Sequence, residues 1–589
     1  VQDVTPIPLL GTEYRVDRTE PIIFSTVDPH VLYYAANRIF RTDDGGRNWQ
    51  TISPDLARKE PGVPASLGTL AEGEPKAAEH RGVVYALGPS FHSLDTLWAG
   101  TDDGLIWVTR DGGEHWNEVT PPKVTAWSKV TQITASHFDD QSAYASVSRF
   151  RIDDLRPYIY RTHDGGRSWK LITRGLPEDA PVDTVREDPV RAGLLFAGTE
   201  TGVWVSFDDG DHWQSLQLNL PHTSMRDLWI HDDDLIVATH GRSFWILDDL
   251  SPLRQIEPST AGRDLVLFKP SRAYRVRRDT NTDTPLPPDE PAGENPPDGA
   301  ILDYYLARPV SGAVVLEILD ADGRLVRRYS SKDSPGPGPE ELEKQLIPTY
   351  WLRPPRILST QAGMHRWVWD LRYPPPEAAT HEYPISAVPH DTPLYPVGPL
   401  VLPGRYEVRL TVGDKSVSHS LTVQMDPRVK TSPAGLQEQF EFSMRLSALL
   451  SDNSRAFTEA RSILEQLDDL IPKASGAAAD EAKGLKEKVS DLLHGASGSD
   501  TAGITTLSQV NGAASTLYGM VGQADTPPTP SQIQATEQLE SGWVPLRREW
   551  ETLKEQDLQR VNQELRSAGL TEIRPELKPR TEAAPINLE

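Results

Sequence analysis

The 589-residue sequence contains no cysteine. Disulfides, thiolate metal sites and cysteine nucleophiles are therefore excluded, but no compartment is indicated, because many exported bacterial proteins lack disulfides. Basic residues are few relative to acidic ones, 60 lysines and arginines against 85 aspartates and glutamates, which gives a net charge of −25. An acidic surface repels phosphate backbones and anionic lipids, so nucleic acid is not an expected partner.

Long apolar runs are absent as well. No stretch approaches the ~18 residues of a membrane span, and the opening VQDVTPIPLLGTEYR has neither the basic nor the apolar region of a signal peptide. The chain starts at Val1 rather than at methionine. We therefore expect an exported protein, periplasmic, cell-surface or extracellular, whose signal peptide or longer N-terminal region is not part of this sequence.

Motifs of the common cofactor and hydrolase sites are also missing. The sequence has no H-E-x-x-H, no G-x-x-x-x-G-K-[ST], no G-x-G-x-x-G and no G-x-S-x-G. No histidine pair has the spacing of metal ligands. We expect no metal and no cofactor.

What the sequence does contain is a repeat. An octapeptide S/T-x-D-x-G-x-x-W, called the box below, occurs four times. Its defining residues are Thr42, Asp44, Gly46 and Trp49; Thr109, Asp111, Gly113 and Trp116; Thr162, Asp164, Gly166 and Trp169; and Ser206, Asp208, Gly210 and Trp213. A fifth, degraded copy at Leu247–Leu250 keeps only the aspartate. The later copies recur every ~40 to 50 residues, the length of one four-stranded propeller blade.

The residues around each box repeat too. An aromatic stands two positions before every copy: Phe40, Trp107, Tyr160, Trp204 and Trp245. Short β-like runs ending in small residues precede these aromatics and turn back into them, which indicates a meander of antiparallel strands. An aromatic on the same face of every unit is what stacked blades bury between them.

The box has a mechanical explanation. Its hydroxyl and carboxylate can accept hydrogen bonds from their own tight turn, its glycine supplies a positive φ, and its tryptophan covers the hairpin. We therefore interpret Asp44, Asp111, Asp164 and Asp208 as structural and not as active-site acids.

The box with its aromatic strand resembles the Asp-box, or BNR, repeat of sialidases, some β-glucan hydrolases and sortilin-type receptors. The last copy, ATHGRSFWILDDL, followed by sandwich-like and helical segments, is similar to the C-terminal portion of bacterial exported proteins named sortilin-like or BNR-repeat glycosyl hydrolases. The resemblance implies more blades than the five visible here. Either the ring is small and closed, or, as we expect, blades are missing from the N-terminal side and another chain or an upstream segment completes it.

The remaining sequence predicts a mainly β, multidomain protein. Strand alternation around Asp322-Gly323 and Gly413-Asp414 predicts an Ig-like β-sandwich, and Leu-, Ala-, Glu- and Lys-rich sequence after Ser432-Pro433 predicts a bundle of about four helices with breaks near Gly476, Gly495 and Pro527. The expected parts are an N-terminal extension (1–20), an Asp-box β-propeller (21–262), a Pro-rich connector (263–299), the sandwich (300–428), the α-helical bundle (429–572) and an extended tail (573–589).

Two functions are compatible with this organisation. The first is an exported binding or scaffold protein whose propeller takes a protein, peptide or glycan ligand, with His240 and Arg242 as candidate contacts and a homo-oligomer as one assembly. The alternative is a glycoside hydrolase, sialidase-like or β-glucanase-like, acting on extracellular polysaccharide with a pair of carboxylates. Candidate acids in the blade loops are Asp102, Asp103, Glu200, Asp232 and Asp234.

Overall fold

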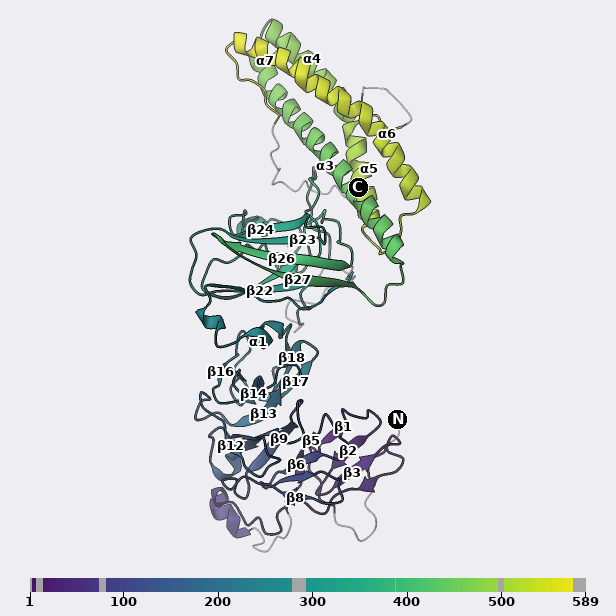
Figure 1. Ribbon diagram of the computed structural model, residues 1–589. Coiled ribbons are helices and arrows are strands. Elements are labelled where there is room, and N and C mark those ends of the chain that lie inside the picture. The colour runs from purple at the N-terminus through teal and green to yellow at the C-terminus, as the bar shows by residue number, and fades with distance from the viewer. Residues whose placement is uncertain are drawn as a thin grey trace. The chain divides into compact units, whose positions relative to one another are not determined.

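The computed structural model describes residues 3–6, 14–73, 81–277, 293–386, 388–495 and 503–575 (Figure 1). The chain divides into two compact units, Val1–Pro258 and Ser259–Glu589. It is mainly β, with many antiparallel sheets and a helical region at its C-terminal end. Among the described residues, no helix combines the length and the apolar character needed to span a membrane.

The first unit contains five consecutive antiparallel sheets, here numbered 1 to 5 in chain order. Within each sheet every strand pairs with the next along the chain. Sheet 1 holds β1 (Ile22–Phe24), β2 (Leu32–Ala35), β3 (Ile39–Thr42) and β4 (Gln50–Thr51); sheet 2 holds β5 (Val84–Pro89), β6 (Leu97–Thr101), β7 (Ile106–Thr109) and β8 (Asn117–Glu118). Sheet 3 holds β9 (Lys129–Ala135), β10 (Ala143–Ser148), β11 (Ile159–Thr162) and β12 (Lys170–Leu171). Sheet 4 holds β13 (Val182–Glu187), β14 (Leu195–Thr199), β15 (Val203–Ser206) and β16 (Gln214–Ser215); sheet 5 holds β17 (Met225–His231), β18 (Asp234–Thr239) and β19 (Phe244–Leu247).

Neighbouring sheets bury their apolar faces against each other. Sheets 1 and 2, 2 and 3, 3 and 4, and 4 and 5 each share a hydrophobic core. The second strands β6 and β14 are buried along their whole length because a sheet covers each of their faces. Their near-continuous apolar sequences, LWAGT and LFAGT, follow from this two-sided burial.

Each box forms one tight turn after the third strand of its sheet. In box 3 the Thr162 hydroxyl accepts a hydrogen bond from the Gly166 N–H at 2.9 Å and donates to Asp164 Oδ1 at 2.9 Å. Asp164 Oδ1 also accepts the N–H of Ser168 at 2.9 Å. The glycine has φ near 85°, which a side chain would strain. The other three boxes repeat these contacts within about 0.1 Å.

The box tryptophans bind each sheet to the one before it. The indole N–H groups of Trp116, Trp169 and Trp213 donate to the carbonyls of Ile52, Val119 and Ile172 at 2.8, 2.7 and 2.8 Å. Each acceptor is the residue directly after the fourth strand of the preceding sheet. The box is therefore both a turn and a clamp between sheets.

Replacing Thr162 by valine is expected to lower the free energy of unfolding by about 1–3 kcal/mol, because the buried Gly166 N–H loses its acceptor. Thr162→Ser is the matched control, since box 4 uses the Ser206 hydroxyl in the same way. Urea unfolding of the full chain measures both. A loss in Thr162→Ser without a loss in Thr162→Val would show that the methyl group, and not the hydroxyl, holds the turn.

The second unit begins with two sheets that share one core. The three-stranded sheet has the order β20 (Leu265–Leu267), β22 (Ala300–Leu306) and β25 (Gly363–Trp369). The five-stranded sheet has the order β21 (Ala273–Arg275), β27 (Lys415–Met425), β26 (Gly404–Val412), β23 (Val314–Leu319) and β24 (Leu325–Ser330). Among the strands described in these two sheets, only β21 runs parallel to its neighbour, β27.

Two predicted boundaries need correction. The stretch 263–299, expected to be a connector, contributes β20 and β21 to the two sheets, because Leu267 and Ala273 are buried in their core. Residues 278–292 of that stretch lie outside the described part of the chain. The expected tail does not begin at 573: Ile573 is buried and exchanges two backbone hydrogen bonds with the Asn562 side chain, at 2.8 and 2.9 Å. Residues 576–589 lie outside the described part of the chain.

The helical region packs around one apolar core. Its helices are α3 (Pro433–Leu470), α4 (Ala477–His494), α5 (Leu507–Val521), α6 (Pro530–Thr552) and α7 (Leu558–Ser567), with a π-helical turn over Leu553–Asp557 between the last two. Ser432 and Thr529 cap α3 and α6 through their hydroxyls. Shorter helices elsewhere are α1 (Ser251–Gln255), α2 (Pro339–Leu342) and 3-10 turns at Ala65–Gly73, Phe150–Ile152, Thr260–Gly262, Thr349–Trp351 and Ile471–Lys473.

Candidate functional site

The hairpins between second and third strands lie together at one end of the sheets. In four of these hairpins, an equivalent backbone N–H donates a hydrogen bond to a carbonyl of the segment before the first strand. The distances are 2.9–3.1 Å, and the donor–acceptor pairs are Asn37–Arg15, Asp102–Val83, Glu200–Pro181 and His240–Ser224. Because antiparallel strands alternate in direction, the turn between first and second strands lies at the other end. The candidate residues Asp102, Asp103, Glu200, His240 and Arg242 therefore share one end, and Asp232 and Asp234 lie at the opposite end of sheet 5.

Asp102 and Asp103 are buried in contacts that hold their hairpin. Asp102 accepts a hydrogen bond from the Val83 N–H and pairs with Arg151, at 2.9 and 2.8 Å. Asp103 accepts from the Thr101 hydroxyl at 2.5 Å and the Arg58 N–H at 2.8 Å. Burial raises the pKa of Asp103. Their own surroundings account for both carboxylates, so we no longer place them in a reactive site.

The acids at the opposite end of sheet 5 do not converge either. Asp232 is 91% exposed. Asp234 accepts the Asp249 N–H at 2.9 Å and so closes the degraded fifth box. Asp232 therefore lies in the turn between β17 and β18, and Asp234 stabilises the fifth box.

Glu200 is the one candidate acid that lies in a converging group. One nitrogen of the Arg226 guanidinium lies 3.4 Å from a Glu200 oxygen and 3.2 Å from an oxygen of Asp183. The second Asp183 oxygen accepts the Ser224 hydroxyl at 3.2 Å. Glu200 comes from the β14–β15 hairpin, Asp183 from the start of β13, and Ser224 and Arg226 from the start of β17. Two carboxylates from one sheet thus meet an arginine from the next.

The two carboxylates have different surroundings. The Asp183 side chain is 11% exposed, whereas that of Glu200 is 40% exposed. Burial, and next the charge of Glu200, raise the pKa of Asp183 to about 6, against the opposing charges of Arg226 and Lys129. A buried acid that holds its proton at mildly acidic pH beside a solvated carboxylate is the arrangement that divides acid and base roles in many enzymes.

A second polar group continues along the first strands. Lys129, at the start of β9, lies with its ammonium 3.4 Å from the ring centroid of Tyr85 in β5. Thr19 donates to the Tyr85 hydroxyl at 3.4 Å. Burial opposes ionisation of this phenol, but hydrogen bonds from Lys129 and Thr19 lower the pKa of Tyr85. The starts of β5, β9, β13 and β17 therefore carry ionisable side chains beside one another.

Sequence reasoning missed Asp183, Arg226, Lys129 and Tyr85. The signal that could have found them is positional: each polar residue opens the first strand of a repeat, where an otherwise apolar strand begins. His240 and Arg242, the candidate ligand contacts, are exposed on the neighbouring β18–β19 hairpin. The His240 carbonyl accepts the Thr223 hydroxyl at 3.0 Å, next to Ser224.

No metal site emerges among the described residues. Asp111, Glu114 and His115 bring potential ligand atoms within 4.8 Å of one another, but all three are exposed. Asp111 and His115 already share a 2.7 Å hydrogen bond inside the second box. The backbone and ring hydrogen bonds from His115 lower the pKa of Asp111 to about 2, which fits a carboxylate that holds a turn.

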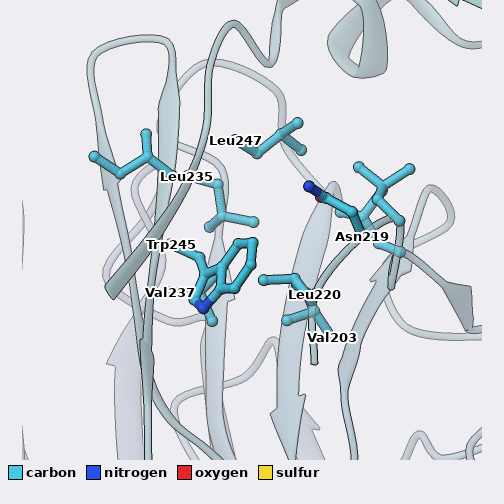
Figure 2. A pocket seen from close by; sticks show the side chains of 10 residues that line it. Val203, Asn219, Leu220, Leu235, Val237, Trp245 and Leu247 are labelled. Carbon is cyan, nitrogen blue, oxygen red and sulfur yellow. The ribbon is translucent and has the colours of Figure 1, made fainter. Parts of the chain in front are cut away.

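A hollow between sheets 4 and 5 lies away from the carboxylates. Its lining is almost entirely apolar: Val203, Leu216, Leu218, Asn219, Leu220, Leu235, Val237, Trp245, Ile246 and Leu247 (Figure 2). Leu216 is the residue directly after the fourth strand of sheet 4, and it is therefore equivalent to Ile52, Val119 and Ile172 of the earlier sheets. In all four residues the backbone N–H donates a hydrogen bond to a carbonyl of the third strand. The degraded fifth box has no tryptophan to meet Leu216. The hollow therefore lies where a box tryptophan would pack against Leu216 if the fifth box contained one.

Known proteins resemble the chain weakly. No protein-family model matches it. The oligoxyloglucan-reducing end-specific xyloglucanase of Emericella nidulans is 23% identical over 184 residues, 31% of this chain and 20% of that enzyme. The GH74 xyloglucanase from Xanthomonas campestris is 17% identical with a TM-score of 0.30, covering 39% of this chain and 36% of that one. YCF48 from Cyanidioschyzon merolae is 14% identical with a TM-score of 0.27, covering 42% and 72%.

The chain thus spans only a fifth of the length of the curated xyloglucanase that it matches. The similarity to xyloglucanases is too low to show an activity. It does not place the chain in a family, although the row of antiparallel sheets is propeller-like.

Proposed function

We propose that the first unit is an Asp-box β-propeller of five visible blades that acts as a glycoside hydrolase on extracellular polysaccharide, with Asp183 and Glu200 as its reacting carboxyl groups. The observation that carries this proposal is the pair of carboxylates held by one Arg226 nitrogen, the buried one with its pKa raised to about 6. This reverses the order of the two functions favoured by the sequence, in which binding came first. The curated similarity to a xyloglucanase agrees with a β-glucan substrate.

The chemistry assigns one role to each carboxyl. Glycoside hydrolysis needs an acid that protonates the leaving oxygen and a carboxylate that activates water or attacks the sugar. Asp183 is the acid, because burial keeps its proton on at mildly acidic pH. Glu200, more exposed, is the carboxylate. Arg226 holds both in the free protein and would contact the bound sugar when the carboxylates turn toward it.

A binding or scaffold protein, exported and sortilin-like, is the second candidate. Its support is that two hollows in the described part of the chain lie away from the carboxylates: one lies between sheets 4 and 5, and one lies in the helical region beside Trp543 and Trp550. In this alternative the polar end of the sheets takes a peptide or glycan without turnover, and the two-sheet part, an Ig-like sandwich in this proposal, is a spacer.

A panel of soluble polysaccharides separates the two functions. The full chain is incubated with xyloglucan, mixed-linkage β-glucan, cellulose derivatives, xylan and sialylated glycans, and both binding and new reducing ends are measured. We expect reducing ends from at least one β-glucan. Binding without release on every member would support the second candidate and contradict the hydrolase.

A further inference from the structure

A hydrogen-bonded group of four side chains connects sheet 3 to sheet 4 at the end where the boxes lie. The Nδ1 atom of His163 lies 2.7 Å from the Ser142 hydroxyl, and the Nε2 atom lies 2.8 Å from Asp209 Oδ2. The Ser142 hydroxyl also donates to Asp139 Oδ2 at 2.9 Å. Asp139 and Ser142 belong to the turn between β9 and β10, His163 to box 3 and Asp209 to box 4. These four residues, here called the His163 cluster, therefore join three turns of two neighbouring sheets.

Asp209 stands at a position where the other three boxes have glycine. Gly45, Gly112 and Gly165 have φ between 69° and 75°. Asp209 keeps this left-handed backbone, with a φ of 61°. A side chain strains this conformation, although aspartate tolerates it better than most residues do. Such strain persists where surrounding contacts hold the residue in place, and the carboxylate of Asp209 makes contacts of this kind with sheet 3.

The Asp209 carboxylate is contacted by three side chains of sheet 3. Oδ1 accepts the hydroxyl of Tyr144 in β10 at 2.7 Å, and Oδ2 lies 2.8 Å from the Arg161 guanidinium in β11. The third partner is His163 Nε2. An ionised carboxylate can only accept, so Nε2 of His163 carries the hydrogen of this contact.

The other ring nitrogen of His163 also carries a hydrogen in this arrangement. Ser142 has a single hydroxyl hydrogen, and it donates this hydrogen to the carboxylate of Asp139 at 2.9 Å. Towards His163, at 2.7 Å, the Ser142 oxygen can then only accept, so Nδ1 must donate. A ring without a hydrogen on Nδ1 would leave one of the two contacts of Ser142 with no hydrogen between its atoms. The complete set of contacts therefore belongs to the doubly protonated, positively charged ring of His163.

Sheets 2 and 3 make the equivalent contact with a permanently charged side chain. Arg110 has the position in box 2 that His163 has in box 3, and it donates to the Gly165 carbonyl at 2.7 Å. Gly165 in turn has the position of Asp209. At both interfaces the second residue of one box thus contacts the fourth residue of the next box. Arginine stays charged at physiological pH, whereas histidine changes its charge between about pH 5 and 8.

Further charged and titratable groups face the His163 cluster from boxes 2 and 4 and from β10 to β13. From these elements come Arg110, Tyr144, Arg161, Lys170, Glu187 and Asp211. Lys170 and Arg161 both lie close to Asp211, at 2.7 and 3.3 Å. Glu187 accepts from Tyr144 at 3.2 Å, and burial raises the pKa of Glu187. Because these six groups are the same in every variant compared below, a pH dependence that changes with His163 belongs to this residue.

We propose that His163 is a pH-sensitive link between sheets 3 and 4, closed while both ring nitrogens carry a proton and loosened when one proton is lost. The neutral ring cannot serve both contacts of Ser142, and its bond to Asp209 loses the charge of the donor. Folding therefore stabilises the charged ring. The contribution of His163 to stability is present at acidic pH and is lost as the pH rises. The inference does not depend on hydrolase activity.

Hydrogen exchange of the full chain at about pH 5.5 and about pH 8 tests the link, because histidine changes its charge between these values. Peptides from boxes 3 and 4 report on it, since their Gly166 and Gly210 N–H groups are bonded inside the two turns. At about pH 5.5, both peptides are expected to exchange about two- to fivefold faster in His163→Gln than in the wild type, the effect of a half-exposed charged pair. At about pH 8, the two proteins are expected to exchange at the same rate, because the wild-type ring is then neutral.

Two further variants separate the charge from the other properties of the side chain. His163→Arg places in box 3 the residue type that box 2 has, and at about pH 8 it is expected to exchange more slowly than the wild type because its charge stays. His115→Asn, which copies Asn48 of box 1, removes a histidine–aspartate pair within one box and is expected to leave boxes 3 and 4 unchanged. Circular dichroism checks that all variants are folded. Equal exchange of His163→Gln and the wild type at about pH 5.5, the same ratio at both pH values, or a His163→Arg protein that loosens as the wild type does would overturn the proposal.

Discussion

Replacing Asp183 by asparagine is expected to lower kcat on the cleaved glycan by about 10²–10⁴-fold, the contribution of a positioned general acid. Asparagine keeps the size of the side chain and can still meet Ser224 and Arg226, but it has no proton to give to the leaving oxygen. KM is expected to change little, because the lost interaction belongs to the transition state. Initial rates of reducing-end release measure both constants.

The pH dependence gives a second readout of the same group. Burial and the Glu200 charge raise the pKa of Asp183 to about 6, so its acid form predominates below pH 6 and is lost above it. Turnover is therefore expected to fall as the pH rises through about 6, and the Asp183→Asn variant is expected to lack this descending limb. Asp232→Asn, at an exposed position at the other end of sheet 5, is the control and keeps the wild-type rate and profile. An unchanged profile in Asp183→Asn would remove Asp183 from the acid role.

The box turns could be predicted residue by residue because their interactions are local. The hydroxyl, carboxylate, glycine and their N–H partners all lie within one octapeptide, so the sequence contains every atom that the turn needs. The helix breaks were equally local: α4 begins after Gly476 and ends before Gly495, and α6 begins at Pro530 with its Thr529 cap. Short-range chemistry decides both features.

The candidate site could not be predicted in this way. Asp183 and Arg226 meet only because the first strands of sheets 4 and 5 pack side by side, and no spacing in the sequence records that contact. Glu200 was proposed from its hairpin, together with acids such as Asp103 that are buried for structural reasons. The same limit applies to β20 and β21, whose three residues each carry too little periodicity to indicate their distant partners β22 and β27.

The second unit contains a buried ion cluster whose disruption is expected to have a large effect on stability. Asp525, in the loop between α5 and α6, pairs with Arg275 of β21 at 2.6 Å and with Arg277 at 2.8 Å. The side chains of Asp525 and Arg275 are almost fully buried. Burial acts against the charged form, but the hydrogen bond and charge of Arg277, with those of Arg275, lower the pKa of Asp525. The cluster joins the helical region to the five-stranded sheet.

Replacing Asp525 by alanine is expected to destabilise the second unit by about 3–5 kcal/mol, because Arg275 is left buried without its counter-charge. Urea unfolding of the full chain, followed through the helical circular dichroism signal, measures the change. Glu540→Gln breaks the exposed Arg445–Glu540 pair between α3 and α6 and is the control, with an expected loss of about 0–1 kcal/mol. Equal losses in the two variants would show that the Asp525 cluster adds no more than a surface pair.

The origin of the loss can be tested by removing the uncompensated charge. If the cost of Asp525→Ala comes from the buried guanidinium, adding Arg275→Met should recover part of the stability, since the double variant buries an apolar chain in place of an unpaired cation. Arg275 also donates to the Val401 carbonyl at 2.8 Å, so recovery is expected to be incomplete. Simple addition of the two single losses would instead show that Asp525 and Arg275 stabilise the unit independently.

The pH dependence of the stability of this unit has a defined sign. Because the pKa of Asp525 is lowered on folding, its stabilising contribution is present above the pKa of the unfolded state and is lost as the pH falls through the pKa of the folded state.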